Sequence, residues 1–288
     1  MKTHLKAMGW RLFPQYFTQK HLATTPGAEI EEVIVPVFLN QSSECIDVGA
    51  NRGRYTILMS RLARQVHAFD PNPSCVEILQ QLGLPNVSIY PHALYSCDGL
   101  TDYFVPVQNG QQFSIWGSLE SSVAASHAEV KSLQVSRTTL DSMCDRPIRF
   151  IKIDVEGHEL EVLQGGRQLM TNQQPICMIE AEERHSPQAI QNVNSFFQAY
   201  GYQGFFILDR CVLPLKQFDQ TYQNPTELQR AVPRVEMRYV NNFIFIPETA
   251  NVKVLCQQMQ DKLNALSPIS KVAPAPQTIV NLADQVNA

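Results

Sequence analysis

The sequence predicts an α/β protein with a Rossmann-like fold, in which helices cover both faces of a mostly parallel sheet that ends in an antiparallel hairpin. Short apolar runs rich in β-branched residues alternate with segments of helical spacing, the pattern of βαβ units. Two later apolar runs, at 202–208 and 211–213, are separated only by Asp209 and Arg210, which is typical of a hairpin. We expect a helical cap at 1–40, a core domain at 41–250, and a helix with a flexible tail at 251–288.

The first apolar run, 44–48, is short and stops at a glycine, so it suits a buried parallel strand better than an amphipathic helix. Gly49 and Gly53 are placed where a Cβ atom would obstruct a left-handed turn or a close backbone approach to a ligand. Asn51, between them, belongs to the residue types that tolerate positive φ. Asp47 lies at the carboxyl end of the strand. The stretch therefore predicts a tight, glycine-containing turn that begins a binding site.

A helix is expected after this turn, because Tyr55, Leu58, Met59 and Leu62 recur at helical spacing. Tyr55 and Thr56 fall in its first turn. The free N–H groups at the start of a helix point at whatever the turn holds, which indicates a cradle for a nucleotide-type cofactor.

The spacing Asp-x-Gly-x-Asn-x-Gly differs from the Gly-x-Gly-x-x-Gly of dinucleotide-binding strands. The Asp47 carboxylate can meet a cation such as the amino group of a methionine moiety, whereas it would repel a pyrophosphate. A second apolar run, 66–69, ends in Asp70, Pro71 and Asn72, which puts a carboxylate where a ribose diol lies in a βαβ unit. Together these residues favour S-adenosylmethionine over NAD as the cofactor. Their order along the chain outweighs the simpler interpretation, in which Asp47 and Asp70 are ordinary loop acids and Gly49 only forms a turn.

Taken in order, these blocks and two later ones resemble the FkbM-type S-adenosylmethionine-dependent methyltransferases over roughly residues 40 to 250. The resemblance implies a class I methyltransferase fold, S-adenosyl-L-methionine as cofactor and methyl transfer as the activity. One departure is Asp70, where glutamate is the more usual residue. The matching stretches are Asp47-Val48-Gly49-Ala50-Asn51-Arg52-Gly53-Arg54-Tyr55-Thr56, Phe69-Asp70-Pro71-Asn72-Pro73, Thr139-Leu140-Asp141, and 150–159 with 162–166. The cofactor-binding residues that we expect are Asp47, Gly49, Asn51, Gly53, Tyr55, Thr56, Asp70, Asn72, His92, Ala93 and Asp154.

The composition limits the other classes of protein to which the chain can belong. With 288 residues, 44% of them hydrophobic and 17% charged, the chain can form one large domain with appendages. The net charge of −4 and the lack of a Lys/Arg run disfavour nucleic acid and acidic membrane surfaces as partners. Seven cysteines without a Cys-x-x-Cys pair, with Cys45, Cys177 and Cys211 in apolar runs, indicate buried free thiols and a cytoplasmic location. We expect neither secretion nor a membrane span, since no apolar run is long enough.

Two segments are assigned by position. His92 and Ala93 follow the third strand, 87–90, where methyltransferases of this general fold commonly meet the adenine. The polar stretch 109–126 is assigned to the mouth of the acceptor site, with a surface insertion as the alternative. At 1–40, an aromatic cluster around Pro14 can be a lid, a dimer face or simple packing, which leaves a homodimer open.

A second group of polar residues follows the buried strand 149–153, whose end carries Asp154, Glu156, His158 and Glu159. The neighbouring strand, 175–179, ends in Glu180, with Glu182, Glu183 and His185 beyond. Ligands bind beyond the carboxyl ends of the strands in open parallel sheets. Two adjacent strand ends therefore present acids to one crevice.

Several roles compete for these residues. Asp154 or Glu156 can cap the following helix, or Asp154 can deprotonate or orient an acceptor hydroxyl, with His158 as a second proton-transfer group. A metal bridging Asp154 and Glu180, with His185 nearby, is conceivable, but no tight ligand spacing occurs and we expect no metal. Lys152, inside the strand, should direct its amine toward the site or a carboxylate, because an unpaired buried ammonium is costly. Our catalytic candidates are Asp154, His158 and Lys152.

The expected function is O-methylation of a hydroxyl on a small molecule, glycan or glycolipid precursor. Two alternatives remain open at this point: a cofactor-binding module without catalysis in a biosynthetic complex, and an NAD-dependent sugar oxidoreductase.

Overall fold

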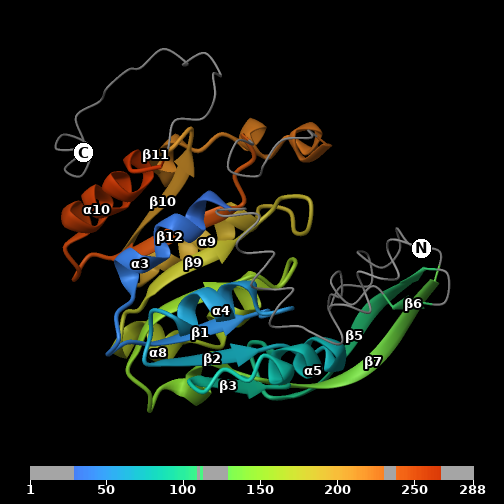
Figure 1. Ribbon diagram of the computed structural model, residues 1–288. Helices are drawn as coiled ribbons and strands as arrows, with labels where there is room; N and C mark the ends of the chain where they lie inside the picture. The colour runs from blue at the N-terminus through green and yellow to red at the C-terminus, as the bar shows by residue number, and fades with distance from the viewer. Residues whose placement is uncertain (1–28, 109–110, 113–128, 230–237, 267–288) are drawn as a thin grey trace.

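The computed structural model describes residues 29–108, 111–112, 129–229 and 238–266. Its main sheet has eight strands in the order β11-β10-β12-β9-β8-β1-β2-β3 (Figure 1). The parallel strands are β1 (Glu44–Val48), β2 (Gln65–Phe69), β3 (Val87–Tyr90), β8 (Ile148–Ile153) and β9 (Ile176–Glu180). The antiparallel strands are β10 (Tyr202–Leu208), β11 (Cys211–Pro214) and β12 (Asn242–Pro247). The predicted mostly parallel sheet with an antiparallel end is confirmed.

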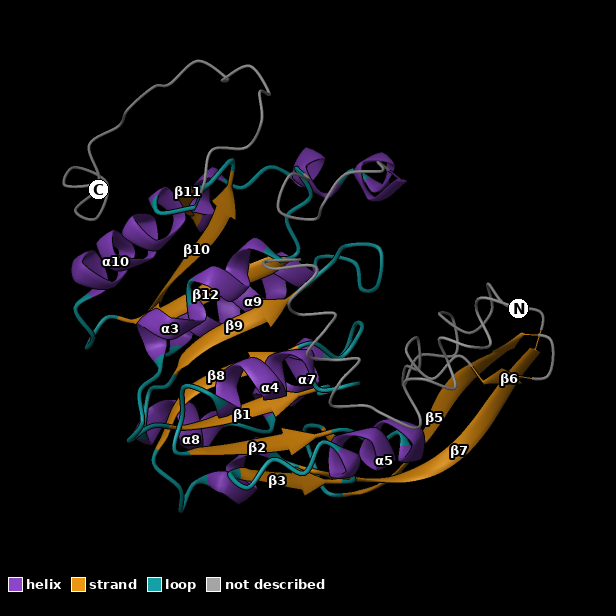
Figure 2. Cartoon of the chain, viewed as in Figure 1, coloured by secondary structure: helices purple, strands orange, loops and turns teal. Residues whose placement is uncertain are grey.

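Helices cover both faces of this sheet, as predicted (Figure 2). One face packs against α3 (Val35–Phe38), α4 (Arg54–Ser60) and α10 (Val252–Asn264). The other packs against α7 (Glu159–Gln164), α8 (Arg167–Asn172) and α9 (Ala189–Ala199). A smaller cluster of apolar side chains packs α5 (Pro73–Gln81) against the β2–β3 edge of the sheet. The described residues also form five 3-10 helices: η1 (Ile30–Val33), η3 (Leu140–Met143), η4 (Leu215–Gln217), η5 (Gln220–Gln223) and η6 (Pro225–Gln229).

Between β3 and β8 the chain leaves the main sheet and builds a second one, in the order β4-β7-β5-β6. Its strands are β4 (Ala93–Leu94), β5 (Gly99–Gln108), β6 (Gln111–Gln112) and β7 (Glu129–Thr138). Strands β5 and β7 form a long ribbon that projects away from the helices and the main sheet (Figure 1). The sequence predicted only 135–139 as the strand we find at 129–138. Most of the stretch 109–126 lies outside the described residues.

The helix predicted after β8 is broken in two at Gly165 and Gly166. An ideal Cβ on Gly165 would lie 2.0 Å from the carbonyl oxygen of Tyr95, so the backbone of the β4 segment occupies the space that a side chain would need. Two adjacent glycines thus separate α7 from α8 and allow the second sheet to approach.

The terminal segments are described in part. Of the predicted cap at 1–40, η1 and α3 are described, and the aromatic cluster around Pro14 lies outside the described residues. At the other end α10 confirms the predicted helix. In the described part of the chain, no helix is both long and apolar enough to cross a membrane. All seven cysteines are free thiols, but Cys211 is exposed, so its predicted burial is wrong, whereas Cys45 and Cys177 are buried.

Candidate functional site

The turn after β1 is left-handed as predicted: φ is 75° at Gly49, 49° at Asn51 and 85° at Gly53. The space beside both glycines is filled by the protein itself. A Cβ on Gly49 would lie 1.8 Å from the carbonyl oxygen of Asp154, and one on Gly53 would lie 2.8 Å from a methyl group of Leu82. The glycines therefore allow the turn to pack against the end of β8 and against the segment after α5.

Asp70, at the end of β2, ties two loops together. Its carboxylate accepts the backbone N–H of Asn51 at 2.7 Å and that of Asn72 at 2.8 Å. Burial raises the pKa of Asp70 to about 6, although both amide bonds favour the charged form. Asn72 in turn caps α5, accepting from the backbone N–H of Ser74 at 3.0 Å. Asp70 thus fixes the turn after β1 relative to the start of α5.

Asp47 points under α4 and is almost fully buried. The hydroxyl of Thr56 donates to its carboxylate at 2.5 Å, and Asp47 is paired with Lys152 in the register of β1 and β8. Burial raises the pKa of Asp47 to about 6, while Thr56 and Lys152 lower it. The side chain of Asp47 therefore joins the glycine turn, α4 and β8.

Lys152 is 1% exposed and has carboxylate partners, as the sequence predicted. Its ammonium nitrogen lies 3.8 Å from a carboxylate oxygen of Glu180 and 4.0 Å from one of Asp154. It donates to the carbonyl oxygen of Ile153 at 3.2 Å and lies 5.2 Å from the centre of the Tyr55 ring. Burial lowers the pKa of Lys152, but the surrounding carboxylates outweigh this effect and raise it.

The N-terminal segment contributes acids that sequence reasoning missed. Glu31, in η1, is buried, and burial with repulsion from Glu29 raises its pKa to about 8. The Tyr55 hydroxyl donates to Glu29 at 2.8 Å. Glu31 lies three residues before buried Ile34, and a 3-10 helix aligns residues that are three apart.

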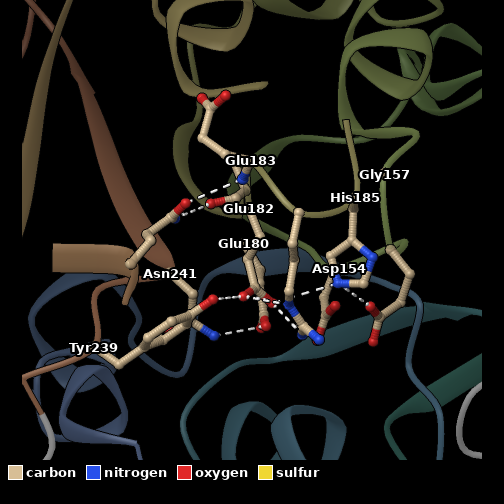
Figure 3. Close-up of polar contacts among 12 residues, drawn as sticks. Asp154, Gly157, Glu180, Glu182, Glu183, His185, Tyr239 and Asn241 are labelled. Atoms are coloured by element: carbon tan, nitrogen blue, oxygen red, sulfur yellow. Dashed lines mark hydrogen bonds and ion pairs between the residues drawn. The ribbon is translucent and has the colours of Figure 1, made fainter. Parts of the chain in front are cut away.

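Asp154 and Glu180 lie side by side at the carboxyl ends of β8 and β9 (Figure 3). Glu180 accepts from the side-chain amide of Asn241 at 2.6 Å. Burial and the neighbouring Asp154 raise the pKa of Glu180 well above its ordinary value. Asp154 keeps 35% of its side chain exposed; partial burial raises its pKa to about 7 against the opposing effect of Lys152. Asp154 is thus the more accessible carboxyl group of this pair.

A second polar cluster borders the pair (Figure 3). The imidazole of His185 lies 2.8 Å from Glu156 and 3.5 Å from Glu182, and these carboxylates, against the effect of burial, raise its pKa to about 9. Arg184 donates to both oxygens of Glu182 at 2.7 and 2.8 Å, and the hydroxyl of Tyr239 also donates to that carboxylate. Tyr239 and Asn241 precede β12 and carry no motif that marks them in the sequence.

The proposed capping role of Asp154 or Glu156 is wrong. Glu159 accepts the backbone N–H of Gly157 at 3.0 Å and that of Val155 at 3.4 Å, and the residue at the start of α7 is His158. His158 is buried beside Glu161, 3.8 Å away, with its ring 5.7 Å from that of Tyr95. Among the described residues no three His, Cys, Asp or Glu side chains are grouped to hold a metal ion.

His92 and Ala93, the two residues that were assigned to the adenine, lie in different surroundings. Ala93 is buried in β4, in an apolar cluster with Tyr103, Val105 and Val135. His92, half-buried, lines a cavity under β4 and β7. Tyr103, which the sequence did not single out, is hydrogen-bonded to Asn72, so β5 covers the end of β2.

A family model described as the methyltransferase FkbM domain matches residues 47–203, just over half of the chain. Among solved structures, the FkbM methyltransferase from Methylobacillus flagellatus is 14% identical, with a TM-score of 0.46, over 71% of this chain and 43% of that one. The chain therefore spans less than half the length of that protein. SMU.1697c from Streptococcus mutans, solved in complex with SAH, is 13% identical over 76% and 96% of the two chains, with a TM-score of 0.41.

A SAM-dependent methyltransferase from Aquifex aeolicus is 14% identical over 80% of this chain and 97% of its own, with a TM-score of 0.38. No curated protein sequence matches the chain.

Proposed function

The chain belongs to the FkbM methyltransferase family, and from this premise we propose that it transfers a methyl group from S-adenosylmethionine to a hydroxyl of a small molecule, a glycan or a glycolipid precursor. The observation that carries this proposal is the assembly of Asp47, Asp70 and Asp154 at one edge of the sheet, within the residues that the family model matches. The hydroxyl as acceptor is supported by the accessible carboxyl group of Asp154 beside that edge.

The charges of this edge fit S-adenosylmethionine. Asp47, Asp154 and Glu180 surround the single ammonium of Lys152, so the surroundings accommodate a sulfonium and an amino group better than a pyrophosphate. We assign the methionine end to the turn with Gly49, Asn51 and Gly53, and to Asp47. The ribose is assigned to Asp70 and Asn72, and the adenine to His92 and Ala93. Tyr55 and Thr56 hold the turn through Glu29 and Asp47.

Methyl transfer is an in-line displacement at a carbon that the bound cofactor activates through its sulfonium. Most of the acceleration can come from holding the acceptor oxygen in line with that carbon. Asp154, the more exposed of the paired carboxyls, would accept the hydroxyl proton. Lys152 would stabilise the carboxylate by its charge at 4.0 Å.

Three other residues would position Asp154. Glu180 lies beside Asp154 and accepts a hydrogen bond from the side-chain amide of Asn241. A substitution of Glu180 or of Asn241 would therefore shift the Asp154–Glu180 pair or change its charge. His158, buried at the start of α7, would hold the segment that follows Asp154, and direct proton transfer by His158 is the alternative role.

Binding and turnover test this function separately. The protein should be stabilised against heat by S-adenosylmethionine and S-adenosylhomocysteine but not by NAD. Acceptors should then be screened with isotope-labelled cofactor and mass spectrometry. A protein that neither ligand stabilises would refute the proposal. Binding without turnover on any acceptor would favour a non-catalytic module, and hydride-transfer absorbance changes would favour a sugar oxidoreductase.

We also propose a reducing, cytoplasmic location, which the seven free thiols support. Nucleic acid is disfavoured as a partner by the net charge of −4. A homodimer through the N-terminal segment is testable by light scattering of the full chain against a chain that starts at residue 29.

A further inference from the structure

The chain turns sharply after β8, at two residues with a left-handed backbone. φ is 55° at Glu156 and 109° at Gly157. Glycine adopts such values readily, whereas a left-handed glutamate is strained and persists only where its surroundings hold it. Glu156 lies two residues after Asp154. The contacts that hold Glu156 therefore also set the path of the chain that leaves Asp154.

His185, in the loop after β9, contacts both residues of this turn. Its Nε2 atom lies 2.8 Å from a carboxylate oxygen of Glu156. An ideal Cβ on Gly157 would lie 3.3 Å from the Cβ of His185, so the histidine also packs against the backbone of the turn (Figure 3). The side chain of His185 is only 11% exposed. His185 thus holds the strained residue by its charge and the next residue by packing.

Other bonds hold the backbone of the turn on either side of Glu156. The N–H of Asp154 donates to the carbonyl oxygen of Val48 at 3.0 Å. Beyond it, the carboxylate of Glu159 accepts from the N–H groups of Val155 and Gly157. None of these bonds involves the carboxylate of Glu156. The contact with His185 therefore adds a constraint on the turn that the backbone bonds do not supply.

The position of His185 is itself fixed. Its backbone N–H donates to the carbonyl oxygen of Glu182 at 3.1 Å, and its ring lies 3.5 Å from the carboxylate of that residue. The hydroxyl of Tyr239 donates to the same carboxylate. At the start of the loop, the buried side chain of Gln223 donates to the carbonyl oxygen of Ala181 at 2.7 Å. The loop after β9 is thus tied down at both of these points.

We infer that His185 is a positioning residue, which keeps Asp154 in place for proton transfer by holding Glu156 in its left-handed conformation. This inference rests on the proposed role of Asp154 as the base, and it gives His185 no contact with the cofactor or the acceptor. The charge of His185 has a separate effect, because it offsets the charge of Glu156, which raises the pKa of Asp154. The positioning effect and the charge effect can be told apart, since they change that pKa in opposite directions.

The test follows the pKa of Asp154 by carbon NMR of the full chain, labelled at the aspartate carboxyl groups. Asp154→Asn identifies the signal. In the wild type, burial raises this pKa to about 7. His185→Leu keeps a side chain of similar size but cannot donate to Glu156. If the turn is released, water reaches Asp154, and its pKa should fall toward the ordinary value of 3.8.

Two further variants make this result specific. His185→Gln keeps a donor for Glu156 without the charge, so the pKa of Asp154 should not fall. His67→Leu is the matched control, because it also removes a buried histidine beside a glutamate, with Nε2 of His67 3.0 Å from Glu44. That pair joins β2 to β1 and lies outside the turn. His67→Leu should leave the pKa of Asp154 unchanged.

The inference is overturned if the pKa of Asp154 stays at its wild-type value in His185→Leu. It is also overturned if that pKa rises, because a rise is the effect of the lost charge alone. An equal fall in His185→Gln or in His67→Leu would contradict it as well. Thermal unfolding identifies any loss of fold in His185→Leu, in which case His185→Ala, which likewise cannot donate, takes its place.

Turnover separates this inference from the proposed function. On the acceptor found in the screen with labelled cofactor, His185→Leu should be slower than the wild type by roughly tenfold or more, because Asp154 is misplaced. The thermal shift by S-adenosylmethionine should equal that of the wild type. Full turnover with a lowered pKa of Asp154 would overturn the inference. A wild type that S-adenosylmethionine does not stabilise would refute the proposed function, whereas the NMR titration would still report on His185.

Discussion

The carbonyl oxygen of Asp154 occupies the space beside Gly49, 1.8 Å from where a Cβ atom on that glycine would lie. The turn that we assign to the cofactor and the residue that we assign to proton transfer are therefore in direct backbone contact. Their separation is set by the lack of a side chain at position 49. This contact can be tested by stability as well as by activity.

Gly49→Ala should destabilise the protein more than Gly201→Ala. Both glycines have positive φ, 75° and 72°, so alanine at either position costs about 1–2 kcal/mol for the left-handed backbone. Nothing lies within 4 Å of a Cβ at Gly201, whereas the Gly49 variant must also displace the end of β8, at about 1–3 kcal/mol more. Urea unfolding measures the difference in the free energy of unfolding. Equal losses of stability in the two variants would show that the turn at Gly49 accommodates the added methyl group without strain.

Asp47→Ala should weaken the binding of S-adenosylmethionine by roughly 1–3 kcal/mol, the effect of removing a buried hydrogen-bonding charge. Asp47→Asn should lose less, because its amide oxygen can still accept from Thr56. Asp261→Ala, on the exposed side of α10, serves as the control and should bind as the wild type does. Unchanged affinity in Asp47→Ala would remove this residue from the cofactor site.

Asp154→Asn should keep cofactor binding while methyl transfer falls by about 10²–10⁴, the usual range for a positioned acid or base. The pKa of Asp154 is raised to about 7, so the wild-type rate should rise with pH through that value as the carboxylate forms. EDTA should have little effect on methyl transfer. His158→Ala should lower methyl transfer, but less than Asp154→Asn does. Turnover lost with EDTA and restored by Mg²⁺ would make Asp154 a metal ligand instead.

The stability of the protein should fall as the pH rises through about 9. The pKa of His185 is raised from 6.5 to about 9 in the folded state, so its stabilising charge is fully present below about pH 6.5 and lost above pH 9. Thermal unfolding from pH 6 to 10 measures this. His185→Gln should flatten the dependence in that range. The same slope in wild type and variant would mean that the ion pair with Glu156 adds nothing to stability.

Much of the sheet could be predicted because its buried strands are short apolar runs bounded by glycine, proline or acids. Strands β1 and β3 occur where expected. The turn between β10 and β11 has positive φ at both Asp209 and Arg210, the twist that a two-residue hairpin favours. The strand ends also located Asp154 and Glu180 correctly, because parallel strands place their carboxyl ends at one edge.

What could not be predicted depends on contacts between distant segments. The first half of β7 is polar and is held by its pairing with β5 rather than by an apolar pattern. The break between α7 and α8 results from the approach of Tyr95. Asn241 and Tyr239 join the site through β12, which pairs with β9 only in the folded chain. None of these contacts has a local signal.

Strand β12 lies between β9 and β10, although both of those leave the ribosome before it does. A nascent chain that has reached residue 238 therefore has two unpaired strand edges facing each other across a gap, and it lacks the amide that holds Glu180. Ribosomes add about 5–20 residues per second, so this open sheet persists only briefly unless synthesis pauses. During that interval the exposed edges of β9 and β10 should make the partly made protein prone to aggregation.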